Sequence, residues 1–305
     1  MKLLTVKTIA GGEFKTLVRQ KTFVLLLTIF LFMAAFSAFI GWSTKNTVTK
    51  IYVATVRELI SSGTKKMPVN PFLSAPPLSI LKNMPTYVFL IGSLLAIIIG
   101  YSSFVRERKA GVIKIIFSRQ ISRVEFLLGK ITGIFLVLSA IVGLSFVLSF
   151  FSVVIISGQM LVFSEMFKLL MFYLVSFLYL IIFAMLGLFF AIFAKSESLA
   201  LLAPMIIWIF ISFVMPQLTS ALDPNSLLNP TSIQSIMPQS VFFTSTRFLL
   251  EPFSVSENYK TISQSFLQGD IKEYPIFSLI VYLFFTMSIP FLVIKKFNVC
   301  EVEIE

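Results

Sequence analysis

The chain has 305 residues, of which 57% are hydrophobic and 13% charged, and its mean hydropathy of +0.94 excludes an ordinary soluble domain, where about a quarter of residues are charged. There is no His and only one Cys, Cys300, which excludes a His-built metal site, a Ser-His-Asp triad and an intramolecular disulfide. The formal charge of +11 comes from Lys and Arg between apolar stretches, so we expect these side chains to face lipid headgroups and not nucleic acid.

Six stretches without acidic or basic residues reach about the 20 residues that cross the hydrocarbon core of a membrane. They cover residues 23–41, 86–105, 131–157, 169–194, 198–222 and 276–294. Because a backbone in lipid must satisfy its own hydrogen bonds, these stretches are predicted to be helices. Only residues 195–197 separate the fourth from the fifth, which predicts a tight hairpin. The sequence therefore predicts an all-α, polytopic membrane protein with a single transmembrane domain over residues 1–305.

The leader before the first stretch has an apolar helical face, with Lys7, Lys15 and Arg19 off that face. The apolar residues are Leu3, Val6, Ala10, Phe14 and Leu17. This pattern predicts a helix that lies in the membrane interface, and the alternative is a basic leader that only aids insertion. The 22-residue polar leader favours a retained anchor over a cleaved signal peptide, although 35–37 has the small-x-small form of a cleavage site.

The two longest connections, 42–85 and 216–275, are predicted to be outer loops. The first opens with apolar residues at helical spacing over 48–59, and Gly63 offers a natural stop. Five prolines follow between Pro68 and Pro85, so we expect the rest of this loop to be extended. In the second loop, an apolar patch over 241–250 either dips into the outer leaflet or packs on the bundle.

The connection between the second and third stretches, 106–130, is the most informative segment. It has a charged start, an apolar middle over 112–117 and a restart at Ser122, which fits a capping box with Glu125. The predicted order is helix, break, helix, with apolar side chains offered at the membrane surface. Such a surface suits a partner protein, and the alternative is a helix that rests on the inner leaflet.

The density of Lys and Arg in the connections predicts the orientation. The inner segments contain 15 basic residues among 61, and they are 1–22, 106–130, 195–197 and 295–305. The outer segments contain 10 among 115, and they are 42–85, 158–168 and 216–275. We therefore expect a multi-pass protein of the plasma membrane with both termini in the cytoplasm.

The 106–130 connection resembles the cytoplasmic signature of type-2 ABC exporter permeases, the ABC-2 class. The residues that match this signature are Glu107, Gly111, Ser118, Arg119, Ile121, Ser122, Arg123, Glu125, Gly129 and Lys130. Gln120 stands where the family often has Pro, and Val112 where Thr is common. The basic leader, the six spans and Asn229-Pro230 after the fifth span extend the resemblance, which is closest to the permeases for copper-enzyme maturation.

The resemblance implies a permease subunit that forms a dimer with a second copy or a similar permease. It also implies that two cytosolic ATPase subunits bind this dimer through the leader helix and the 106–130 loop and drive transport. It implies an interfacial helix with Phe14, Leu17 and Arg19. It implies a coupling helix with Glu107, Arg108, Gly111, Ile113, Ile116 and Phe117. In that helix the apolar residues, Ile116 and Phe117 among them, would fill a groove on the ATPase, and the two charged residues would lie at the rim.

The chain lacks a nucleotide site of its own. A phosphate-binding loop needs Gly-x4-Gly-Lys-Ser/Thr, whereas Gly129-Lys130 is followed by Ile131 and has Val124 where the first Gly should be. We therefore expect no enzyme activity and no cofactor on this chain, with ATP and Mg bound by the partner ATPase.

An ATP-independent secondary transporter or channel is the alternative from another functional class. Ion-coupled carriers usually keep acidic, basic or His side chains within their spans, and none of the six stretches contains one. A membrane-embedded hydrolase would need the same groups. These absences favour the exporter, and a soluble P-loop ATPase encoded beside this chain would distinguish it from the carrier.

Overall fold

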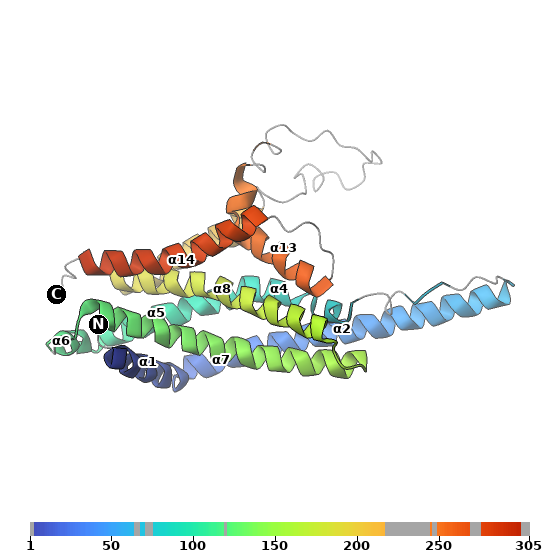
Figure 1. Ribbon diagram of the computed structural model, residues 1–305, viewed down its shortest axis with the longest axis horizontal. Helices are drawn as coiled ribbons and strands as arrows, with labels where there is room; N and C mark the ends of the chain where they lie inside the picture. Colours follow the sequence, from blue (N-terminus) through green and yellow to red (C-terminus); the bar gives the residue numbers. More distant parts are fainter. Residues whose placement is uncertain are drawn as a thin grey trace.

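The computed structural model describes residues 3–63, 68–70, 76–118, 121–216, 245, 249–268 and 276–299. Helices account for nearly all of these residues, and no strand occurs among them. The helices form an elongated bundle, with α1 (Leu3–Val18), α6 (Val112–Phe117) and the end of α14 (Ile276–Val299) at one end (Figure 1). The predicted all-α, polytopic membrane fold is confirmed.

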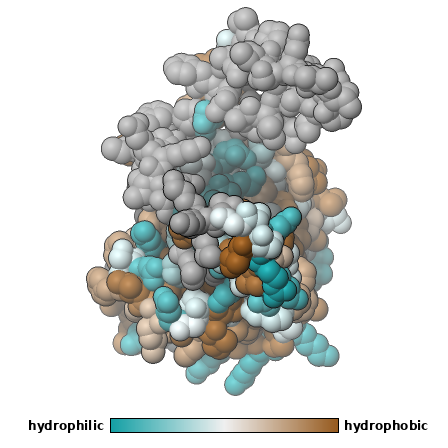
Figure 2. Space-filling model, turned by 90° about the vertical axis from the view of Figure 1, so that its right-hand side faces the viewer, coloured by the Kyte–Doolittle hydropathy of each residue, from teal (hydrophilic) through white to brown (hydrophobic). Residues whose placement is uncertain are grey.

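Helix α2 runs without a break over Lys21–Ser61, so the first predicted span and the helix predicted after it are one element. Its 41 residues are about 60 Å long at 1.5 Å per residue, about twice the hydrocarbon thickness of a bilayer. The helix ends near the predicted stop, where Gly63 has φ +75°. The far half projects beyond the bundle (Figure 1) and has exposed charged residues, Lys50, Arg57 and Glu58. Hydrophilic residues are also visible in the view from that end (Figure 2).

The segment after Pro76 is helical, so the extended conformation predicted there is wrong. It forms a 3-10 helix, η1 (Pro77–Leu81), and a helical turn, α4 (Met84–Tyr87), each with a proline in its first two positions. Proline fits there because the first N–H groups of a helix have no partner within the helix. The apolar side chains of η1 are buried, and Gly41 of α2 leaves room for the backbone of Ile80.

The helix of the second predicted span consists of α4, a π-helical turn η2 (Val88–Gly92) and α5 (Ser93–Lys109). Helix α5 packs against α8 (Phe163–Phe193) nearly backbone to backbone. A Cβ atom added at Gly100 would lie 1.9 Å from the carbonyl oxygen of Ala184, and one at Gly187 would lie 2.3 Å from that of Ile97. Such close approach through small residues is the usual way that helices associate in lipid. Helix α8 also packs against four further helices, so it is the central helix of the bundle.

The capping box predicted for α7 (Arg123–Ser157) is present. The Ser122 hydroxyl accepts a hydrogen bond from the Glu125 N–H at 3.2 Å, and the Glu125 carboxylate accepts one from the Ser122 N–H at 3.5 Å. Helices α8 and α9 (Glu197–Ile209) form the predicted tight hairpin, where Ser196 caps α9. A π-helical turn, η3 (Phe210–Val214), extends α9.

One helix of the last predicted outer loop, α13 (Val255–Gln268), was not predicted. It follows a 3-10 turn, η4 (Glu251–Phe253), and packs against α8. The Tyr259 ring of α13 stacks on Tyr179 of α8 with centroids 4.4 Å apart. Of the predicted patch over 241–250, the structure describes only residues 245, 249 and 250, so its placement lies outside the described residues.

Five stretches of the described residues are helical, long and apolar enough to cross a membrane, and they coincide with the first five predicted spans. These stretches are Phe23–Ser61, Pro77–Lys109, Arg123–Ser157, Phe163–Phe193 and Glu197–Val214. Helix α14 covers the sixth predicted span and is apolar over Tyr282–Lys295, and its crossing of the membrane stays a prediction. Residues 217–222 and Cys300 lie outside the described residues.

Candidate functional site

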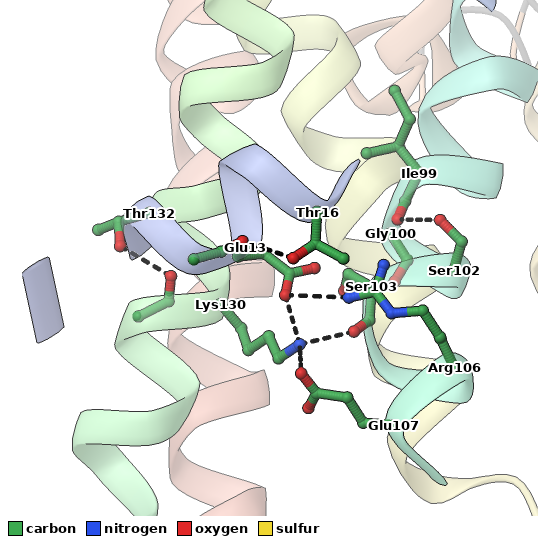
Figure 3. Close-up of polar contacts among 12 residues, drawn as sticks. Glu13, Thr16, Ile99, Gly100, Ser102, Ser103, Arg106, Glu107, Lys130 and Thr132 are labelled. Carbon is green, nitrogen blue, oxygen red and sulfur yellow. Dashed lines mark hydrogen bonds and ion pairs between the residues drawn. The ribbon is translucent and has the colours of Figure 1, made fainter. Parts of the chain in front are cut away.

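Four charged side chains from three helices meet at the end of the bundle where α6 lies. Glu13 comes from α1, Arg106 and Glu107 come from the last turn of α5, and Lys130 lies near the start of α7. Figure 3 shows their charged groups turned toward one another in the space between the three helices. We call these four residues the charge cluster.

Lys130 is the centre of the charge cluster and is only 1% exposed. Its Nζ atom lies 2.5 Å from Glu13 Oε2, 2.5 Å from Glu107 Oε1 and 2.8 Å from the carbonyl oxygen of Ser103 (Figure 3). An ammonium group has three N–H donors, so each donor finds an acceptor. This coordination offsets the desolvation penalty of a buried cation. Lys130 therefore joins α1, α5 and α7 at one point.

Glu13 reaches the cluster because α1 packs very close to α7. A Cβ atom added at Gly133 would lie 2.6 Å from the Glu13 Cβ atom, and one added at Gly129 would lie 2.6 Å from the Ile9 Cβ atom. The two glycines are four residues apart and share one face of α7, which makes a Gly-x-x-x-Gly contact. The Glu13 side chain is consequently buried although it belongs to a short helix on the surface of the bundle.

Burial raises the pKa of the Glu13 carboxyl group above its usual value, and the positive charges of Lys130 and Arg106 act in the opposite direction. Arg106 Nη2 lies 3.5 Å from Glu13 Oε2. In the described part of the chain, three buried atoms of the cluster have no hydrogen-bond partner: Glu13 Oε1, Arg106 Nη1 and Glu107 Oε2. The two acids and two bases balance in charge, but the cluster can still make further hydrogen bonds.

Helix α6 lies beside the charge cluster and has one buried and one exposed face. Ile113 is buried, and the Phe117 ring meets the Phe126 ring of α7 edge-on with centroids 5.4 Å apart. Val112 and Ile115 are 36% and 62% exposed. The helix is therefore fixed to the bundle on one side and presents apolar side chains on the other.

The residues of the predicted coupling helix fall in two helices, because Gly111 takes the left-handed φ of +66° and separates α5 from α6. Glu107 is turned into the bundle toward Lys130, not to the rim of an exposed helix. Arg108 remains exposed and donates a hydrogen bond to the carbonyl oxygen of Ala194, at the end of α8, at 2.8 Å.

Two predicted coupling residues, Ile116 and Phe117, are partly buried against the core. The exposed apolar residues of α6 are instead Val112 and Ile115. The sequence of 112–117 could not distinguish these two pairs, because a single charged residue, Lys114, in a six-residue helix does not define which face is exposed.

The residues predicted for the interfacial helix are divided between two environments. Leu17 is buried, Phe14 is partly buried against the core, and Arg19 is exposed in the turn after α1. Leu3, which was predicted on the same apolar face, is 76% exposed. Helix α1 therefore packs on the bundle from Val6 onward, and its first turn does not.

Sequence reasoning missed the roles of Glu13 and Lys130. A signal for Glu13 was present, because it follows Ala10 by three residues and precedes Leu17 by four, which places an acid on the apolar face of the helix. No comparable signal identified Lys130 as its partner. The described residues hold no group of three or more His, Cys, Asp and Glu suited to a metal ion, and the cluster is best described as a junction of three helices.

Comparison with known proteins places the chain in a family. A model of the family described as ABC-2 family transporter protein matches residues 7–294. A search of curated proteins found no match. The matched range contains the charge cluster, α6 and the five helical stretches that are apolar and long enough to cross a membrane. The chain therefore belongs to the ABC-2 transporter family, and it is a membrane permease of an ABC transporter.

Proposed function

We propose that this permease is the membrane subunit of an exporter that works as a dimer and is driven by separate ATPase subunits in the cytoplasm. The absence of a phosphate-binding loop from the sequence supports a separate ATPase, which would bind ATP and Mg. The high density of Lys and Arg in the predicted inner segments supports a plasma-membrane orientation with α1, α6 and the end of α14 on the cytoplasmic side.

The exposed apolar face of α6 is the observation that carries the proposal. Val112 and Ile115 lie at the end of the bundle and beyond the charged last turn of α5, where lipid tails would not cover them. The centres of protein interfaces are depleted of charge and the rims are polar. Lys109 and Glu197, which form an exposed ion pair at 2.8 Å, supply such a rim. We infer that a groove on the ATPase receives Val112 and Ile115.

The charge cluster supports a path for movement from α6 into the membrane helices. Only Ala110 and Gly111 separate α6 from α5, and the Phe117–Phe126 contact joins α6 to α7. Lys130 then ties α5 and α7 to α1. A displacement of α6 would therefore move these helices together as one rigid body, which is a common form of switching in transporters.

The test is co-purification of the tagged permease with the soluble P-loop ATPase that we expect to be encoded beside it. We expect Val112→Asp and Ile115→Asp each to release the ATPase while the permease stays folded in the membrane. Truncation of a desolvated interface anchor typically costs more than about 2 kcal/mol, which is about thirtyfold in affinity.

Ile60→Asp is the matched control, because Ile60 is 56% exposed at the far tip of α2. This variant receives the same charge at a comparably exposed apolar site and should retain the ATPase. Unchanged recovery of the ATPase with both α6 variants would show that α6 is not the docking helix.

A further inference from the structure

The last turn of α5 contacts the short turn between α8 and α9 through two cations. Arg108 Nη1 donates a hydrogen bond to the carbonyl oxygen of Ala194 at 2.8 Å, and Lys109 Nζ lies 2.8 Å from Glu197 Oε2. Ala194 directly follows α8, and Glu197 is the first residue of α9. The turn is therefore held to α5 at both of its ends. We call these two contacts the hairpin clamp.

Helix α9 has few other contacts that fix its position. Ala200 and Pro204 are its only buried residues, whereas 16 of the 31 residues of α8 are buried. Near its other end, Trp208 Nε1 donates a hydrogen bond at 2.7 Å to Ser93 Oγ, at the start of α5. The polar side-chain contacts between α9 and other helices of the described chain thus lie at its two ends, and both are made with α5.

Helix α5 is firmly fixed by comparison. It packs nearly backbone to backbone on α8, and Glu107 in its last turn binds Lys130 in the charge cluster. Only Ala110 and Gly111 separate this last turn from α6. A displacement of α6 therefore reaches the hairpin clamp before it reaches α9.

We propose that Arg108 and Lys109 are positioning residues for transport, which make α9 move together with α5 when the ATPase displaces α6. This inference rests on the proposed function. Both contacts are at least partly exposed, and such contacts contribute little to stability. The hairpin clamp therefore sets the position of α9 more than it stabilises the fold. Leu202 and Ile206 of α9 are 54% and 65% exposed, so the position of α9 determines part of the surface that the protomer presents in the membrane.

The first experiment uses the purified full-length permease without any ATPase. Spin labels at Leu136 of α7 and Leu202 of α9, both exposed, report the distance between these helices in a Cys300→Ser background. An excess of unlabelled chain keeps the two labels of one chain apart from other labels. The wild type should give a narrow distance distribution. Lys109→Glu should broaden it, because it places two acids side by side, and Lys109→Glu with Glu197→Lys should make it narrow again.

Lys50→Glu is the matched control, because it reverses the same charge at an exposed site on the projecting half of α2. It should leave the distribution unchanged. Arg108→Ala should broaden the distribution as Lys109→Glu does. A narrow distribution in both Arg108→Ala and Lys109→Glu would overturn the proposal, and so would a failure of the reversed pair to restore the wild-type distribution.

The second experiment repeats the measurement on the complex with the ATPase, with and without a non-hydrolysable ATP analogue. In the wild type the distance should stay the same, because α7 and α9 move together. In Lys109→Glu it should shift when the analogue binds, although the ATPase is recovered as before, since rim charges contribute little to affinity. A contact that was merely structural would broaden the distribution without making it respond to the nucleotide.

The outcomes separate this inference from the proposed function. A shift in the wild type, or no shift in Lys109→Glu, would overturn the role of the hairpin clamp while the ATPase still binds. If the wild type did not retain the ATPase at all, the proposed function would fail, and the first experiment would still decide whether Arg108 and Lys109 hold α9 in place.

Discussion

The charge cluster at the α6 end and the hydroxyl contacts along the middle of α8 both join helices, but with different chemistry. In the second region, which we call the hydroxyl seam, the Tyr173 hydroxyl lies 2.6 Å from Ser149 Oγ, and the Tyr259 hydroxyl lies 2.9 Å from Ser176 Oγ. The charge cluster has two acids and two bases in a similar space, with Lys130 at its centre.

The difference follows from depth in the membrane. A charged side chain near the bilayer centre is costly. Ser145, Ser149 and Tyr173 lie within the uncharged stretches 131–157 and 169–194, so this part of the seam joins helices with neutral hydroxyl groups, which also make hydrogen bonds between helices in lipid. The cluster lies where the uncharged stretches end, and there a complete set of counter-charges offsets the desolvation of its cation. We therefore expect substitutions in the cluster to have larger effects on stability than substitutions in the seam.

The largest effect is expected from Lys130→Met, because it leaves the buried Glu13 and the partly buried Glu107 close together without their shared cation. Removal of one partner from a buried ion pair typically costs about 3–5 kcal/mol. The free energy of unfolding in detergent micelles should fall by about this amount. The triple variant Glu13→Gln, Glu107→Gln, Lys130→Met, which removes all three charges, should recover most of the loss.

Lys50→Met is the control for Lys130→Met, because Lys50 is exposed on the projecting half of α2. Its stability should equal that of the wild type within error. If Lys130→Met were equally harmless, the contacts of Lys130 would not hold the three helices together.

The positions of the helices could be predicted from the sequence, because each of their signals is local. Absence of charge over about 20 residues marked the stretches that cross lipid, and Ser122 with Glu125 marked the start of α7. The end of α2, two residues before Gly63, had a local signal as well. After Pro76 the local signal was misleading. The prolines predicted an extended segment, but the burial of η1 against α2 outweighed that tendency and the segment is helical.

The charge cluster could not be predicted, because its members are far apart in the chain. Glu13 and Lys130 are separated by 117 residues, and helical periodicity indicates which face a residue occupies but not which helix it meets. Gly129 and Gly133 allow α1 to approach α7, but this role can be recognised only once the partner helix is known. Helix α13 was missed although Val255, Tyr259 and Ile262 have helical spacing, because three Ser and one Asn share the buried face with them and make it look less apolar in the sequence.

A smaller effect is expected in the hydroxyl seam. Tyr173→Phe removes the contacts of one hydroxyl with Ser149 Oγ at 2.6 Å, with Ser145 Oγ at 3.2 Å and with the carbonyl oxygen of Ser145 at 3.1 Å. Hydrogen bonds between helices in membranes average about 0.6 kcal/mol, with a maximum of about 1.7. The free energy of unfolding should therefore fall by about 1 kcal/mol, and Tyr52→Phe on the projecting half of α2 should leave it unchanged. A loss as large as that of Lys130→Met would contradict the contrast between the two regions.

The smallest effect is a pH dependence that separates the two regions. Because burial raises the pKa of Glu13 above its usual value of 4.5, the folded protein binds this proton more tightly than the unfolded chain. The free energy of unfolding should therefore decrease as pH rises from 4.5 through the raised pKa. The decrease should be small, because Lys130 and Arg106 oppose the effect of burial. Glu13→Gln should lack this component of the pH profile, whereas Tyr173→Phe should keep the wild-type profile at a lower stability. If the wild type instead gained stability relative to Glu13→Gln over this range, the ion pairs would outweigh burial, and the pKa of Glu13 would be lowered in the folded protein.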